Sequence, residues 1–258
     1  MTYRIGLLCL LLASAAPLAF GVVPVVKTVP WVAGNPGIPH DTIHGRAITV
    51  KATTDVSGTN YQYMWDFGDG TSTAWADVGT KQYNLGEGHT YTGSVGQTFT
   101  ATITVRNKLN PLESGTANYF TAIRAISGPN LQVEVNMAID RALWYMHTAM
   151  TTRAGSGGAI TGYWSPGYGG QAALNTNAFL VNGHKPDPDP TNPNPYAETV
   201  MRGMNWALTR LNVTATGSRT NPHGTFLADG NGNGKRTYEA YDQAMYTTGM
   251  FVDMLVAT

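Results

Sequence analysis

The sequence is nearly free of cysteine and poor in charge. Its 258 residues contain one cysteine, Cys9, and charged residues make up 12% of the chain. A single cysteine excludes an intrachain disulfide framework and a cysteine-rich zinc site. The 16 Lys and Arg residues balance the 16 Asp and Glu residues, so the basic excess typical of nucleic-acid-binding proteins is missing. We therefore expect no nucleic-acid partner.

The first twenty residues predict a secretory signal peptide. Arg4 supplies the positive charge before the apolar run from Ile5 to Leu12, and Ala13-Ser14-Ala15 fits the small-residue pattern of a cleavage site. The alternative is an uncleaved membrane anchor, because the stretch without charge continues to Val26. We expect a protein that is secreted or held at the cell surface, with a membrane contact only if this segment stays uncleaved.

Short strands separated by turn residues predict a β-sandwich over residues 22–126. In the strongest run, apolar side chains alternate with threonines, which indicates one buried and one solvated face of an antiparallel sheet. The apolar side chains of that run are Phe99, Ala101, Ile103 and Val105. The other strand-like runs are Ala47–Ala52, Tyr61–Trp65 and Tyr119–Ile123.

One motif in this region is specific. Trp65-Asp66-Phe67-Gly68-Asp69-Gly70-Thr71 is followed by His89-Thr90-Tyr91 and by the run from Phe99 to Asn107. Residues 24–126 thereby resemble the polycystic-kidney-disease (PKD) repeat. The resemblance implies an immunoglobulin-like antiparallel sandwich that serves as a non-catalytic extracellular spacer or adhesion module, with polysaccharide or protein as its partner.

The polar residues of this motif have structural interpretations. Asp66 and Asp69 stand beside glycines, as in a tight turn, and His89 is expected to be a positioned structural side chain.

After Ser127-Gly128-Pro129-Asn130, which we take as the domain boundary, the periodicity becomes helical. Helices are predicted at 135–146, 172–181, 196–211 and 242–257. The run from Ile139 to Tyr145 matches the run from Val200 to Trp206, which suggests a repeated unit of helix, loop and helix. Trp144, Tyr145, Trp164, Trp206 and Tyr246 are expected in the core, and a ligand cavity is the alternative.

Residues 130–258 thereby resemble the α/α-hairpin repeats of the squalene-cyclase and prenyltransferase toroid superfamily. Such hairpins bury their inner faces only against neighbours, so two hairpins suggest a partial toroid and an incomplete domain. The acid pair that the resemblance calls for is not matched, since Asp187-Pro188-Asp189-Pro190 reads as an extended loop. We assign no catalytic residue and no organic cofactor.

One loop has the composition of a calcium site. The run from Asp229 to Glu239 resembles the pattern D-x-[DN]-x-[DN]-G-x5-E, whose side chains offer the hard oxygens that calcium prefers. The candidate ligands are the side chains of Asp229, Asn231 and Asn233, the carbonyl of Lys235, and Glu239. Glu239 stands one position early for the last ligand, and a glycine-rich turn before a helix is the alternative.

Two functions remain open. The first is an exported, non-catalytic binding or structural protein that contacts protein or polysaccharide. The second is a fragment of a secreted enzyme, terpene-cyclase-like or glycan-active, whose catalytic residues lie outside this chain. The apolar terminal hairpin also predicts self-association.

Overall fold

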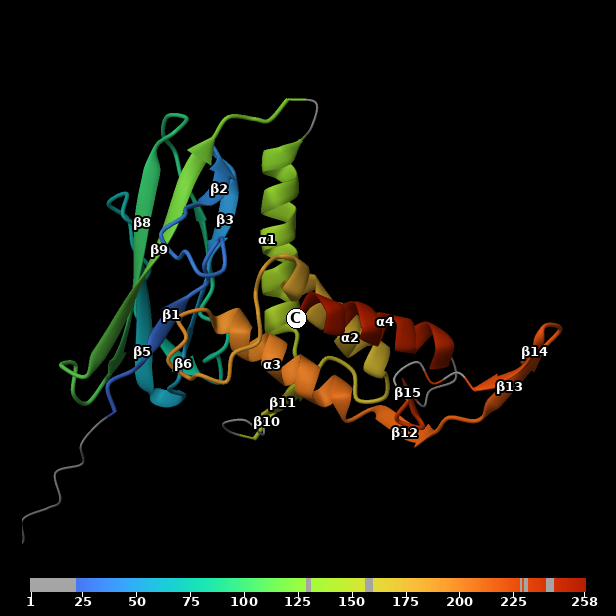
Figure 1. Cartoon of the computed structure of the whole chain (residues 1–258). Helices are drawn as coiled ribbons and strands as arrows, with labels where there is room; N and C mark the ends of the chain where they lie inside the picture. Colours follow the sequence, from blue (N-terminus) through green and yellow to red (C-terminus); the bar gives the residue numbers. More distant parts are fainter. Residues whose placement is uncertain (1–21, 129–130, 156–159, 228, 230–231, 240–243) are drawn as a thin grey trace, which may run out of the picture.

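The computed structural model describes residues 22–128, 131–155, 160–227, 229, 232–239 and 244–258. The predicted signal peptide at 1–20 lies outside this part. No helix within the described ranges combines the length and the apolar character needed to cross a bilayer. The described chain forms a β-sandwich followed by a mainly helical domain (Figure 1).

The larger sheet of the sandwich has five strands in the order β2-β9-β8-β5-β6. The predicted alternation is confirmed in its central strand, because Phe99, Ala101, Ile103 and Val105 are buried and the threonines between them are not. The strands are β2 (His40–Ile43), β5 (Gly58–Asp66), β6 (Ala76–Gly79), β8 (Thr98–Asn107) and β9 (Ser114–Arg124).

Two antiparallel strand pairs complete the sandwich. They are β1 (Val26–Thr28) with β4 (Ala52–Thr54), and β3 (Ala47–Val50) with β7 (Glu87–Thr90). Trp65 is fully buried in the core between the strands. Its indole Nε1 donates a hydrogen bond to the carbonyl of Leu85 at 2.8 Å, which satisfies the polar atom of this large apolar side chain.

Two details of the predicted sandwich are wrong. The sheet is not wholly antiparallel, because β2 runs parallel to β9. The run from Ala47 to Ala52 is two strands that break at Lys51. Lys51, at the break, is 1% exposed because its ammonium contacts Asp140 of the helical domain.

Four helices follow within the described part of the chain, as predicted. They are α1 (Gln132–Thr148), α2 (Gly169–Val181), α3 (Pro195–Leu208) and α4 (Ala244–Ala257). At the start of α3, the side chain of Asn194 accepts a hydrogen bond from the backbone N–H of Tyr196 at 3.0 Å, and Pro195 takes the first helical position. The predicted end of this helix is wrong, since Leu211 begins a strand.

The segments between the helices were predicted to be loops, but they contain short strands. Short antiparallel strand pairs form where β-branched and polar residues flank turn residues, and β13 and β14 extend away from the helices in Figure 1. The pairs are β10 (Thr152–Ala154) with β11 (Thr161–Tyr163), β12 (Leu211–Ala215) with β15 (Lys235–Glu239), and β13 (Ser218–Asn221) with β14 (Gly224–Leu227).

The helical core is built where α2 packs against α3 and α4. Phe179 and Phe251 are buried there, at 0% and 1% exposure. Trp144 joins this core as predicted, but Tyr145 is 70% exposed because it faces away from it. The toroid arrangement of these helices stays a prediction. So does self-association, for which α4 offers the exposed side chains of Val252 and Val256.

Candidate functional site: a buried junction and its pocket

A buried ion cluster joins the two domains. Asp140 projects from α1, Lys51 lies between β3 and β4, and His40 begins β2. The Lys51 ammonium contacts Oδ2 of Asp140, and Nδ1 of His40 lies 3.2 Å from Oδ1 of the same carboxylate. The three residues are 8%, 1% and 2% exposed, in that order, so this charge cluster is sealed from solvent.

Burial and pairing act in opposite directions on Asp140. Burial by itself disfavours the charged carboxylate, but the charges and hydrogen bonds of Lys51 and His40 outweigh it and hold the pKa of Asp140 well below its usual range. Burial lowers the pKa of Lys51, and the neighbouring Asp140 opposes that shift. The Asp140 carboxylate is therefore ionised and electrically compensated.

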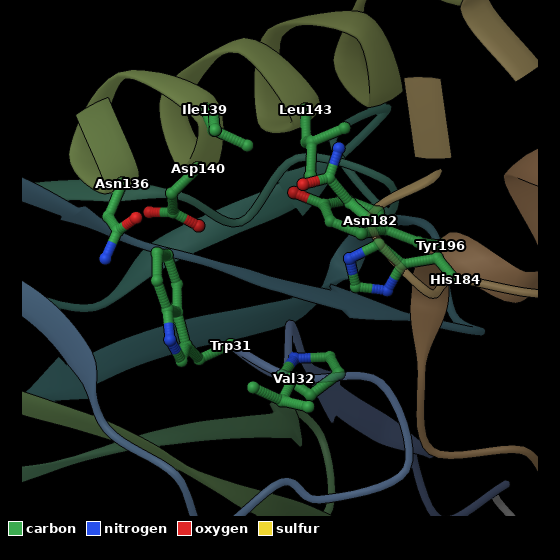
Figure 2. Close-up of a pocket in the computed structure, with 10 residues that line it drawn as sticks. Trp31, Val32, Asn136, Ile139, Asp140, Leu143, Asn182, His184 and Tyr196 are labelled. Atoms are coloured by element: carbon green, nitrogen blue, oxygen red, sulfur yellow. The ribbon is translucent and has the colours of Figure 1, made fainter. Parts of the chain in front are cut away.

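A pocket of about 220 Å³ opens beside this cluster. Figure 2 shows Ile139, Asp140 and Leu143 pointing from α1 toward the pocket, Trp31 and Val32 on the opposite side, and His184 and Tyr196 at its end. Four separate segments build it: the residues after β1, the helix α1, the turn after α2, and the start of α3.

The polar groups at the end of the pocket are uncharged. The Asn194 amide donates to Nδ1 of His184 at 3.1 Å, so the neutral ring carries its proton on Nε2. Burial lowers the pKa of His184 to about 4, and burial together with the charge of Asp140 raises the pKa of Tyr196 well above its usual value. The Tyr196 hydroxyl is buried and has no hydrogen-bond partner among the described residues.

A second, larger groove of about 590 Å³ runs along the same domain junction. Lys27 on β1 donates to the carbonyl of Pro190 at 2.6 Å across it. The carboxylate of Asp187 accepts a hydrogen bond from the backbone N–H of Asp189 at 2.9 Å, and the carboxylate of Asp189 accepts one from the backbone N–H of Thr191 at 2.8 Å. These two acids hold the turns of an extended loop, as the sequence predicted.

Beside this groove, His147 makes a buried contact between the domains that the sequence did not reveal. Its Nε2 donates to the carbonyl of Tyr83 at 3.0 Å, so Nδ1 accepts from the hydroxyl of Thr199 at 2.6 Å. Burial first, and then the nearby charge of Arg153, lower the pKa of His147 well below its usual value. The ring is neutral at physiological pH.

We expect the free energy of unfolding to fall as the pH is lowered from 6.5 to 5. His147 and His184 have folded-state pKa values below their unfolded value, so below pH 6.5 the unfolded chain binds more protons. Each histidine then removes at most about 1.4 kcal/mol per pH unit, and about half of that at pH 6.5, where the unfolded side chain is half protonated. Urea denaturation at half-unit pH steps measures this slope. The slope should persist in His223→Gln, whose side chain is exposed, and a flat profile would contradict the assignment.

The turn of the W-D-F-G-D-G motif is structural, as predicted. Asp66 accepts a hydrogen bond from the N–H of Gly68 at 2.9 Å, and Asp69 accepts one from the N–H of Thr71 at 3.0 Å. His89 lies 2.7 Å from the second carboxylate oxygen of Asp69. Its ring also stacks on Phe67, with centroids 3.8 Å apart. These contacts fix the turn onto the sandwich.

The structure brings together only part of the predicted calcium loop. Asp229 accepts from the N–H of Gly234 at 2.6 Å, and Asn233 accepts from the N–H of Lys235 at 2.8 Å, so both side chains support the turn. Glu239 ends β15 and is 1% exposed, about 13 Å along the strand from Lys235.

Asn231 lies outside the described residues. Within the described part of the chain, no three His, Cys, Asp or Glu side chains converge on one point. Calcium binding by this loop stays a prediction.

The junction was not predicted from the sequence because its members look ordinary there. Lys51 falls within a run of alternating residues, and Asp140 falls within a run of helical spacing. One sequence signal could have indicated the junction. Asp140 lies on the apolar side of α1, between the buried side chains of Met137 and Leu143.

Comparison with known proteins supports the first domain. Residues 39–120 match the PKD domain family. The chain is similar to the PKD domain of an M14-like peptidase from a Thermoplasmatales archaeon, with 17% identity over 40% of this chain and 94% of that one, at a TM-score of 0.29. No curated protein matches the sequence.

A second similarity extends over more of the chain. It is to a family 76 glycoside hydrolase from a bovine Bacteroides thetaiotaomicron strain, with 16% identity over 56% of this chain and a TM-score of 0.23. The match spans about a third (32%) of that hydrolase. At TM-scores this low, neither solved structure carries an argument about function, so the assignment of residues 39–120 as a PKD domain rests on the sequence match.

Proposed function

Since residues 39–120 are a PKD domain, we propose that the chain is an exported, non-catalytic binding or structural protein. Its PKD-type module would mediate interaction with polysaccharide or protein at the cell surface or outside the cell. A calcium ion in the loop at 229–239 and self-association through α4 remain additional proposals.

The buried junction is the observation that supports this proposal most. The Lys51–Asp140 pair and the His147–Tyr83 contact fix the PKD domain against α1 and α3. Two hollows open along this fixed junction, with residues from both domains in their walls. Binding sites are commonly concave and lie at domain interfaces, so a rigid composite surface suits a binding role.

Affinity electrophoresis of the mature protein tests the proposal. The protein is run through native gels that contain starch, xylan, mannan, soluble chitin or pectin, next to a gel without polysaccharide. We expect retarded migration in at least one of the gels. If migration is unchanged in every gel and the protein also fails to bind cell-wall preparations and surface proteins, the binding role is contradicted.

A further inference from the structure

The pocket beside Asp140 has the size of a site for one small ring. Its volume of about 220 Å³ lies below the roughly 300–1,000 Å³ of pockets that hold drug-sized ligands. At about 30 Å³ per water molecule, it would hold about seven waters. A single hexose ring with its hydroxyl groups is a ligand of this scale.

One wall of the pocket is apolar and carries an aromatic face. Trp31 is half-buried, and its ring packs in an edge-to-face arrangement with the ring of His40, with ring centroids 5.5 Å apart. Ile139 and Leu143 face it from α1 (Figure 2). An aromatic ring offers a large, rigid contact surface to the C–H face of a sugar at little cost in conformational entropy.

The other end of the pocket has neutral hydrogen-bonding groups to spare. Nε2 of His184 is a donor that takes part in none of the hydrogen bonds described for this residue. Tyr196 is 1% exposed, and its hydroxyl has no hydrogen-bond partner among the described residues. A buried hydroxyl without a hydrogen-bond partner costs about 1–3 kcal/mol of stability. A ligand that offers this hydroxyl a hydrogen-bond partner is therefore favoured in the pocket.

The charges next to the pocket are already paired with each other. The carboxylate of Asp140 is paired with Lys51 and His40, so it leaves no free charge to pair with a charged ligand. No uncompensated cation lines the pocket among the described residues. These features select a ligand that carries hydroxyl groups and no charge.

We propose that this pocket binds a single neutral sugar unit, stacked on Trp31 and hydrogen-bonded to Tyr196 and His184. This inference rests on the proposed function and narrows it, because it names polysaccharide as the partner and the domain junction as the place where one unit of the chain is held. A purely protein partner is the competing outcome of the test.

Saturation-transfer NMR with methyl glycosides tests the pocket directly. The probes are the methyl glycosides of glucose, mannose, galactose and N-acetylglucosamine, with methyl glucuronide as the charged comparison. We expect the mature protein to bind at least one neutral probe and to bind the glucuronide more weakly. Tyr196→Phe removes one hydrogen bond and should weaken binding about 3- to 10-fold, while Trp31→Ala should weaken it more than about tenfold.

Matched variants separate binding from folding. Tyr145→Phe changes an exposed tyrosine of α1, and Trp75→Ala changes a tryptophan that lies under Arg106 in the sandwich; both should bind as the parent does. Thermal melting should show no loss of stability in Tyr196→Phe, because the hydroxyl that it removes has no partner.

The possible results distinguish the pocket from the wider function. Binding of a methyl glycoside that both pocket variants weaken supports the inference even if no polysaccharide gel retards the protein. Retardation in a polysaccharide gel without glycoside binding, or with glycoside binding that the pocket variants leave unchanged, overturns the inference and keeps the proposed function. If no probe of either kind binds, the inference is overturned, and the proposed function is overturned as well only if the protein also fails to bind cell-wall preparations and surface proteins.

Discussion

Replacing Asp140 by alanine is expected to destabilise the folded protein by about 3–5 kcal/mol. The variant leaves the ammonium of Lys51 buried at 1% exposure without its carboxylate. An uncompensated buried charge is costly because water can no longer solvate it. Chemical denaturation with urea or guanidinium measures the loss, and a loss below 1 kcal/mol would contradict the burial of this pair.

Two further variants identify the cause of that loss. The double variant Lys51→Met with Asp140→Leu removes both charges together, so it should recover most of the lost stability. Asp77→Ala breaks the exposed ion pair with Lys108 and should change the free energy of unfolding by about 0–1 kcal/mol. A double variant as unstable as Asp140→Ala would point to packing and not to charge.

Replacing Gly68 by alanine is expected to destabilise the PKD domain by about 2–5 kcal/mol. Gly68 has a φ of +73°, and a Cβ atom there would lie 2.2 Å from the backbone carbonyl oxygen of Thr100. The substitution therefore adds left-handed strain to a steric clash with β8, which is fixed at the centre of its sheet.

Gly70→Ala is the matched control for this effect. Its φ is +91°, but nothing lies within 4 Å of the added Cβ atom. It should cost only the backbone strain, about 1–2 kcal/mol. Melting curves of the two variants compare the costs, and equal losses would show that the clash with Thr100 is relieved by movement of the turn.

The sequence predicted the elements whose burial is decided locally. The alternation from Phe99 to Val105 and the W-D-F-G-D-G turn identified the sandwich, and the apolar spacing from Val135 to Met146 identified α1. The parallel pairing of β2 with β9 could not be foreseen, because strand direction depends on the path of the chain between them. The strands after α3 were missed because glycines and asparagines interrupt the alternation in that segment.

The candidate site was less predictable than the fold. Lys51, Asp140 and His184 lie far apart in the sequence, and only the packing of α1 against the sandwich brings the first two together. No local pattern marks a lysine whose solvated face another domain will cover. The unpartnered hydroxyl of Tyr196 is likewise a property of its surroundings, since the helical spacing of α3 explains its burial equally well.

The Lys51–Asp140 pair also bears on which domains can be combined. If either domain stood alone, its charged side chain would meet water at little cost. A sandwich with an apolar residue in place of Lys51 would instead bury the carboxylate of Asp140 without compensation when it docked on α1. The pair thus makes the docking of the two domains specific. The buried charge that a mismatched domain leaves unpaired costs more free energy than the matched ion pair contributes.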